Sequence, residues 1–303
     1  MRLRGCLVLI GFFSVFSVFK AIDDAGLPWQ IALIAVIALF IWAARVQDRA
    51  RCSSSAVTSL SNNNPELKKP KSRERSISIT QHTSSDIETA LERLPTYILQ
   101  RSGSVFYTGK DAFLGQNPLY ILGLNPGGNP DIQRTNTVAG HIDDFRNRSA
   151  PWSAYADDSW EGMTPGTCGM QPRVLHMLKR LDLDPRKVPA SNVVFVRSRN
   201  EAELDAEKSI LLRDCWPVHG SVISKLGIRV VLCFGGTAGR WVRGQVGATQ
   251  LVDEFRETNA RGWKSEAHSS PNGLIVITAT HPSRADWRNP AADPTPLVKR
   301  MLR

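Results

Sequence analysis

Four runs of apolar residues recur between residues 119 and 280, each ending at glycine, proline or a polar residue. They are residues 119–123, 192–198, 229–234 and 273–280. Short continuous apolar runs closed by turn residues are typical of buried strands in a parallel sheet. Amphipathic or helix-forming segments lie between them, at 174–183, 202–216 and 237–242. The alternation predicts a three-layer α/β/α domain around a small, mainly parallel four-stranded sheet.

The remaining segments of this domain have weaker patterns. Apolar residues at helical spacing predict a first helix over 86–99, interrupted by Pro95, and a short edge strand over 105–107. Residues 129–172 are polar and rich in Gly and Pro, which predicts an irregular and functional segment. The polar segment 253–270 is hairpin-like. These patterns place one globular domain over residues 86–303.

The amino-terminal region has a different pattern. Leu3–Phe19 and Pro28–Ala44 are apolar stretches joined by a short acidic link, with arginines before the first and after the second. Each is about 17 residues, or about 26 Å as a helix, which suffices for a thin bilayer. The positive-inside rule then predicts a transmembrane hairpin over 1–45, with both ends in the cytoplasm of a bacterial-type inner membrane. The alternatives are a signal peptide or single anchor, and a soluble helical hairpin.

Charge and composition favour an anionic partner. The 303 residues contain 38 Lys and Arg against 28 Asp and Glu, a net charge of +10, which suits nucleic acid or lipid headgroups. Residues 46–85 are rich in Ser, Asn, Lys and Arg and predict a disordered basic linker, which either lies on anionic lipid or is simply solvated. The five cysteines have no metal-ligand spacing, so a reducing compartment and no metal are expected.

The ends of the first and last strands carry the candidate chemistry. Gly123 is followed by Asn125, Pro126, Gly127 and Gly128, and the carboxyl end of such a strand is where an open α/β sheet builds its site. Glycines after the turn let a ligand approach the backbone. The last strand ends in His281-Pro282-Ser283.

Together these motifs resemble those of the uracil-DNA glycosylase superfamily. Gly-Leu-Asn-Pro-Gly at 123–127 is similar to the mismatch-specific and single-strand-selective branches, and His-Pro-Ser at 281–283 to the second motif of the superfamily. Arg288-Asn289-Pro290 adds to the likeness, and 192–198 and 229–238 resemble the middle strands. The resemblance covers roughly residues 104–303.

The resemblance implies a role for each motif residue. Asn125 orients the attacking water, and His281 donates a hydrogen bond to the leaving base. Gly123 and Pro126 shape the site. Ser283 and the backbone amides of Gly127 and Gly128 hold flanking phosphates. The residues after the second motif contact or wedge DNA; they are Arg284, Trp287 and Arg288, and for Trp287 packing is an equal alternative. No cofactor is implied, and an iron–sulfur cluster is excluded because the cysteine cluster is missing.

Two positions depart from the family. Where it has an amide side chain that reads the pyrimidine edge, this chain has Ser198, with Asn200 as a possible substitute. The aromatic residue that follows the first motif is also missing, and Phe145 or Trp152 are candidates to replace it.

Two main hypotheses follow. The first is a membrane-tethered DNA glycosylase that hydrolyses the N-glycosidic bond of uracil or a related damaged base. The second is a non-catalytic, membrane-tethered module of the same fold that binds a nucleotide or nucleic acid. A nucleotide-dependent enzyme of doubly wound fold is weaker, because the chain has neither a G-x-G-x-x-G fingerprint nor a Walker P-loop.

Overall fold

The computed structural model describes residues 86–303, which belong to one compact unit. The predicted membrane hairpin (1–45) and basic linker (46–85) lie outside the described residues. Between residues 86 and 303, no helix is both long enough and apolar enough to cross a membrane.

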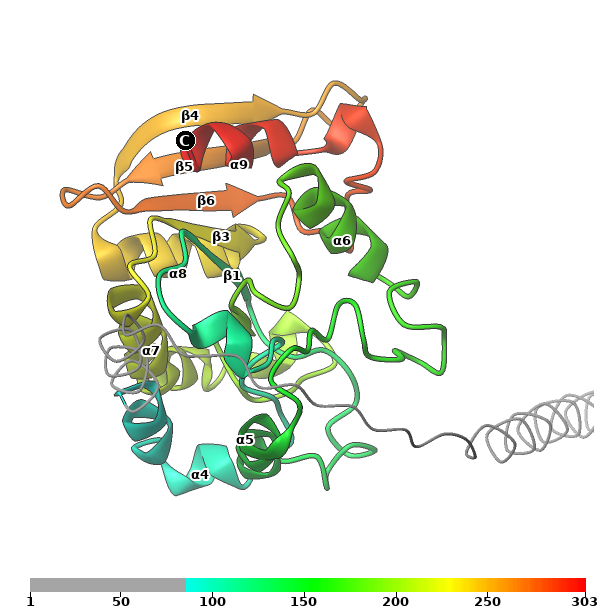
Figure 1. Cartoon of the computed structure of the whole chain (residues 1–303), viewed down its shortest axis with the longest axis vertical. Helices are drawn as coiled ribbons and strands as arrows, with labels where there is room; N and C mark the ends of the chain where they lie inside the picture. Colours follow the sequence, from blue (N-terminus) through cyan, green and yellow to red (C-terminus); the bar gives the residue numbers. More distant parts are fainter. Residues whose placement is uncertain (1–85) are drawn as a thin grey trace, which may run out of the picture. The chain divides into compact units, whose positions relative to one another are not determined.

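A mixed six-stranded sheet forms the centre of this unit (Figure 1). Its strand order is β2-β1-β3-β6-β5-β4. β2, β1, β3 and β6 are parallel, whereas β5 and β4 are antiparallel to their neighbours. The bounds are β1 Leu119–Gly123, β2 Ala190–Asn192, β3 Val230–Phe234, β4 Gln250–Arg256, β5 Lys264–Ser269 and β6 Ile275–Ala279.

The predicted count of four strands was therefore too low. The predicted segments 119–123, 229–234 and 273–280 each contain a parallel strand, whereas the fourth parallel strand, β2, overlaps the predicted segment 192–198 only at Asn192. In addition, β4 and β5 form a hairpin whose second strand pairs with β6. The side chains of β4 are largely exposed, so this segment lacks the apolar run that marks a buried strand. The hairpin was expected at 253–270, but its addition to the sheet was not.

Helices cover both faces of the sheet. The helices are α4 Thr96–Leu99, α5 Val138–Asn147, α6 Gln171–Arg180, α7 Lys208–Lys225, α8 Gly236–Val246 and α9 Thr295–Met301. Along β1, Tyr120 and Leu122 face a core shared with α4, α5, α7 and α8. Leu119 and Ile121 face a second core shared with α6 and α9. The two-residue period of a strand thus divides its apolar side chains between two cores.

The second strand is shorter than predicted. β2 ends at Asn192, although the residues that follow it, 193–196, remain buried. Beyond β2, the bonds to the first-motif segment run from Val193 N to Gly123 O, from Val194 N to Leu124 O and from Ser198 N to Pro126 O. The apolar run at 192–198 thus reflects burial beyond the end of the ladder. Residues 103–106 add only isolated bridges here, so the predicted edge strand does not form.

One helix was not predicted. α5 lies inside the segment expected to be irregular, and its apolar face consists of Val138, Ile142 and Phe145. The Thr137 hydroxyl caps it by accepting a hydrogen bond from Gly140 N at 3.1 Å. Gly140 and the flanking polar residues obscured this helical spacing. Conversely, the break at Pro95 is confirmed, because helical residues 86–92 end before α4 begins.

Candidate functional site

The candidate site lies at the carboxyl edge of the parallel strands. Asn125 follows β1, Gly235 follows β3, and His281 follows β6. Since β3 lies between β1 and β6, the axes of the outer two strands are two spacings apart, or roughly 10 Å. The sheet therefore brings the two predicted motifs to one edge, with Gly235 between them.

Asn125 is oriented through its amide nitrogen. Its Nδ2 donates to the hydroxyl of Ser198 at 2.9 Å and to the carbonyl of Pro126 at 2.9 Å. Both N–H groups are thereby used. Its Oδ1 accepts no hydrogen bond from any other residue in 86–303, and the side chain is half-buried. The arrangement leaves a fixed acceptor free for a water molecule.

Ser198 supports Asn125. It is 3% exposed, and its hydroxyl accepts from Asn125 and donates to the Asn200 carbonyl at 2.7 Å. Asn200 does not substitute as a reading amide, because its side-chain oxygen caps the 3-10 helix at Glu201–Leu204 by accepting from Glu203 N. Neither residue presents a free amide pair to a pyrimidine. We therefore reassign Ser198 to orienting Asn125.

At two positions of the first motif, the local packing or backbone conformation requires a glycine. A Cβ on Gly123 would lie 2.1 Å from Asn192 Oδ1, so this glycine permits the close packing of β1 against β2. Gly128 has φ +114°, and a Cβ there would meet Gln133 Oε1 at 2.4 Å. Gly127 and Gly128 are exposed, Pro126 is buried, and the carbonyl of Gly127 accepts from Arg197 Nη1. Only the exposed glycines offer backbone to a ligand.

His281 is held as a neutral donor. The backbone N–H of Ser283 donates to His281 Nδ1 at 3.0 Å, so Nδ1 is the acceptor and the ring proton lies on Nε2. The Ser283 hydroxyl lies 2.8 Å from the same nitrogen. Burial, together with the charge of Arg284, lowers the pKa of His281 to about 4. Near neutral pH its Nε2–H is a donor with no partner among residues 86–303.

A cavity of about 410 Å³ opens beside His281. Its wall includes the glycine turn after β3, the end of β6, and three side chains from outside the parallel strands. The lining residues are Gly235, Gly236, Trp263, Lys264, Thr278, Ala279, Thr280, His281 and Arg284. The hydroxyls of Thr278 and Thr280 are buried without a hydrogen-bond partner within the described part of the chain. The cavity thus combines unsatisfied polar groups, two cations and an aromatic ring.

Trp263 was not singled out by the sequence. It follows Gly262 in the turn between β4 and β5 and is 44% exposed. The guanidinium of Arg261 lies 4.4 Å from the centre of its ring. A single aromatic residue next to a glycine in a polar hairpin was the available signal. The aromatic candidates named instead do not line this cavity: Phe145 is buried against Phe106, and Trp152 lies under Arg148.

The residues after the second motif differ in availability. Trp287 is fully buried, packs against Phe234, and donates its indole N–H to the Thr280 carbonyl at 3.1 Å. The packing alternative is therefore correct for Trp287, and a DNA wedge is excluded. Arg288 forms two hydrogen bonds of 2.9 Å with Asp286, which neutralises its charge. Arg284 is exposed and lines the cavity.

No cation site is evident in the described part of the chain, because no three His, Cys, Asp or Glu side chains converge between residues 86 and 303. Cys233 is buried in the core, as expected, and Cys215 is buried as well. Comparison with known proteins adds no assignment, since neither a family model nor a curated protein matches this chain.

Proposed function

We propose that this protein is a membrane-tethered hydrolase of N-glycosidic bonds, similar to uracil-DNA glycosylases, that acts on uracil or a related damaged base in DNA. The observation that carries the proposal is the complementary pair at one sheet edge. Asn125 offers a fixed acceptor and His281 a fixed neutral donor. Excision of a base requires these two functions, one for the water and one for the departing base.

The reaction assigns one task to each group. A water held by Asn125 Oδ1 forms a bond to the anomeric carbon as the bond to the base nitrogen breaks. The base leaves with the bonding electrons, and His281 Nε2–H stabilises its negative oxygen. One water proton ends on the released base, and the sugar keeps the hydroxyl. Because an amide does not ionise, the enzyme lacks a strong general base and is expected to be slow.

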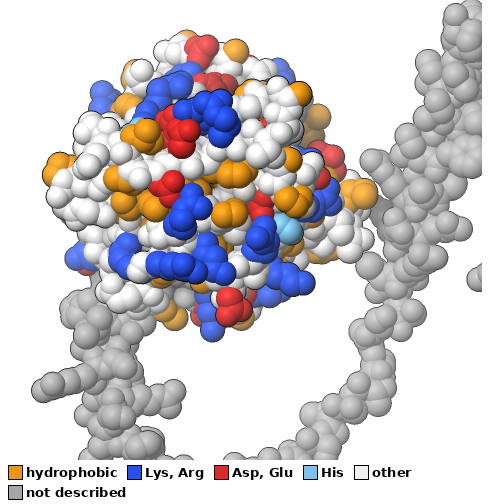
Figure 2. All heavy atoms as spheres, turned by 90° about the horizontal axis from the view of Figure 1, so that it is seen from above, with side chains coloured by type: hydrophobic (Ala, Val, Ile, Leu, Met, Phe, Trp, Pro, Cys, Tyr) orange, Lys and Arg blue, Asp and Glu red, His pale blue; other side chains and the backbone are white. Residues whose placement is uncertain are grey.

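The cavity beside His281 supports recognition of a base. The exposed Trp263 ring supplies a stacking surface that is missing after the first motif. Thr278 and Thr280 form part of the cavity wall. Arg284 supplies positive charge for a phosphate, whereas Lys264 is paired with Glu254 at 2.7 Å. Figure 2 shows Lys and Arg side chains gathered in a band on one side of the unit, with fewer Asp and Glu.

The alternative is a binding module that does not cut. It is favoured by one observation: Ser198 and Asn200 are occupied within the fold, so no amide at the second strand reads a pyrimidine. On this alternative the cavity at His281 holds a nucleotide or a base of nucleic acid.

A glycosylase assay separates the two. The full chain, solubilised in detergent, is incubated with end-labelled single- and double-stranded oligonucleotides containing uracil, hypoxanthine or a thymine mismatch. Alkali-labile sites are expected with the wild type and should be lost in Asn125→Ala and His281→Ala. The matched control Asn147→Ala removes an exposed amide at the end of α5 and should remain active. Binding of the same oligonucleotides without alkali-labile sites would overturn the hydrolase and favour the binding module.

A further inference from the structure

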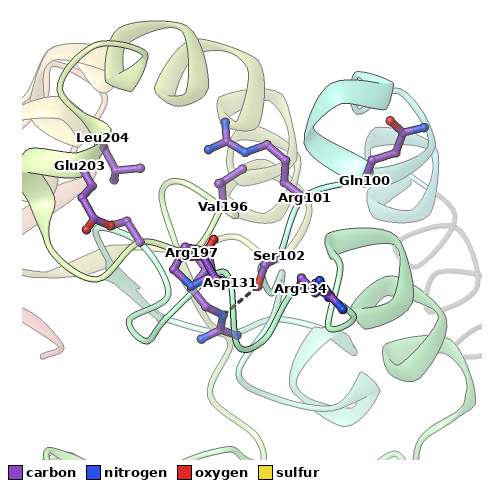
Figure 3. A pocket seen from close by; sticks show the side chains of 11 residues that line it. Gln100, Arg101, Ser102, Asp131, Arg134, Val196, Arg197, Glu203 and Leu204 are labelled. Atoms are coloured by element: carbon purple, nitrogen blue, oxygen red, sulfur yellow. Dashed lines mark hydrogen bonds between the residues drawn. The ribbon is translucent and has the colours of Figure 1, made fainter.

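A second cavity is lined in part by Ser198, the hydrogen-bond partner of Asn125, and shares no lining residue with the cavity at His281. Its volume is about 290 Å³, close to the lower end for small-molecule sites. Three segments form it, at 100–102, 130–134 and 196–204. Figure 3 shows Arg101, Arg134 and Arg197 around this hollow, which we call the arginine pocket.

Arg197 is the central cation of the arginine pocket. Its Nε donates to the Ser102 hydroxyl at 3.2 Å (Figure 3). Its Nη1 donates to the carbonyl of Gly127. Both partners are neutral, and no carboxylate of residues 86–303 lies within ion-pair distance of it. Burial lowers the pKa of Arg197, as expected for a desolvated charge without a counter-ion. Its remaining N–H groups suit an anionic acceptor.

The other charged side chains around the pocket form ion pairs, with one exception. Asp131 and Glu203 share a single cation, Arg199, so these three side chains carry one net negative charge. Arg101 pairs with Glu207 at 2.6 Å. The exception is Arg134, which is exposed and forms no ion pair with any residue from 86 to 303. Arg134 and Arg197 together outweigh the one unbalanced carboxylate, so the pocket keeps a net positive charge.

We propose that the arginine pocket binds a phosphate group, held by the guanidinium fork of Arg197 and by Arg134. A planar guanidinium matches two oxygens of a phosphate, and a half-buried position strengthens the contact relative to the surface. The source is either the backbone of a single DNA strand or the phosphate of a free nucleotide. The inference stands apart from the proposed hydrolysis, because an anion would bind here whether or not a glycosidic bond is cut.

The position of Arg197 has a consequence for the other site. Its guanidinium also holds the carbonyl of Gly127, two residues beyond Asn125. A phosphate in the arginine pocket would therefore fix the strand, or the nucleotide, directly behind the turn that carries Asn125.

The test measures binding by the full chain in detergent at low ionic strength, by calorimetry. The three probes are inorganic phosphate, deoxyuridine monophosphate, and a single-stranded oligothymidine. Arg197→Lys keeps the charge but loses the fork and should weaken phosphate binding about tenfold. Arg134→Gln should weaken it about threefold, in keeping with an exposed charge. The control Lys179→Gln removes an exposed cation from α6, on the other face of the sheet, and should bind as the wild type does.

A much tighter oligothymidine complex that depends on both arginines supports a strand backbone as the source. Equal affinities for phosphate and nucleotide, with the same dependence, support a free nucleotide. Unchanged affinity in Arg134→Gln and Arg197→Lys would overturn the proposal, as would a wild type that binds phosphate no better than chloride. Should Arg197→Lys fail to fold, Arg134→Gln decides alone, because its exposed side chain forms no hydrogen bond or ion pair between residues 86 and 303.

Discussion

The hydroxyl of Ser198 accepts a hydrogen bond from the amide of Asn125 and donates one to the carbonyl of Asn200. These two hydrogen bonds fix the orientation of the Asn125 side chain and leave its amide oxygen free. A serine is too short to read a base from this buried position, but it is the right length to hold a neighbouring amide. Under the proposed function, Ser198 is therefore a positioning residue for Asn125 rather than a residue that reads the base.

Ser198→Ala tests this role at the residue scale. Without the hydroxyl, Asn125 keeps only the Pro126 carbonyl as a partner, so its amide rotates more freely. We expect kcat for base excision to fall about tenfold while KM stays within about twofold, since Arg134, Arg197 and the cavity beside His281 are unchanged. Steady-state kinetics on a uracil oligonucleotide measure kcat and KM separately. Ser198→Thr retains the hydroxyl and should recover much of the rate; an equal loss in both variants would contradict the positioning role.

At the element scale, α8 determines the shape of the cavity beside His281. It begins directly after the turn at Gly235, and its Gly239 packs against β6. A Cβ on Gly239 would lie 2.1 Å from the Thr278 hydroxyl oxygen. The helix approaches the sheet closely only because this position has no side chain, and Thr278 belongs to the cavity wall.

Two glycines of this helix provide a matched pair of variants. Gly239→Ala should destabilise the protein by about 1–3 kcal/mol, because the added methyl overpacks the contact with Thr278. Gly244→Ala lies on the exposed side of the same helix, with nothing within 4 Å, and should stabilise by about 0.5–1 kcal/mol. Denaturant unfolding followed by tryptophan fluorescence measures both. Equal effects would show that the close approach of α8 to β6 is not tight in solution.

At the scale of the whole molecule, His219 links α7 to the centre of the fold. It is fully buried, with Nδ1 2.8 Å from the Tyr120 hydroxyl and Nε2 3.1 Å from the Val193 carbonyl. A carbonyl only accepts, so Nε2 carries the proton and Nδ1 accepts from Tyr120. Burial lowers the pKa of His219 to about 4. Between about pH 4 and pH 6.5 the imidazole is thus neutral in the native protein but charged in the unfolded chain.

Acid should therefore destabilise the fold through this histidine. Between about pH 6.5 and pH 4 the unfolded state binds a proton that the native state does not, so stability is complete above this window and falls as the pH drops through it. His219→Gln removes that proton uptake. The variant should be less stable at pH 7 but show a shallower loss toward pH 4, measured as denaturation midpoints across the range. A slope unchanged from the wild type would exclude His219 as a contributor.

The membrane tether is a second prediction for the whole chain. Residues 1–45 are expected to hold the protein in a membrane, because each apolar stretch is about long enough to cross. The full chain should sediment with membranes and resist extraction at high pH. A variant without residues 1–45 should stay in the supernatant, whereas deleting part of 46–85 should have no effect. Recovery of the full chain in the supernatant would contradict the tether.

The sequence alone indicated the parallel strands and both motifs, because buried strands and tight turns leave local signals in composition and spacing. Apolar runs marked β1, β3 and β6, and the polar residues at their ends marked Asn125 and His281. Such signals depend on neighbours along the chain. They predicted that the two motifs lie at one edge of the sheet, although not that a hairpin adds two further strands.

Only the tertiary structure decided how the side chains around these motifs are used. Ser198 forms a hydrogen bond with Asn125, and Trp287 is buried. Trp263 lines the same cavity as His281. Each of these placements depends on contacts between segments that lie far apart in the sequence. The arginine pocket is of the same kind, because whether Arg197 has a counter-ion depends on what packs around it. Hydrogen-bond partners and burial are properties of the folded neighbourhood, and no local pattern in the sequence encodes them.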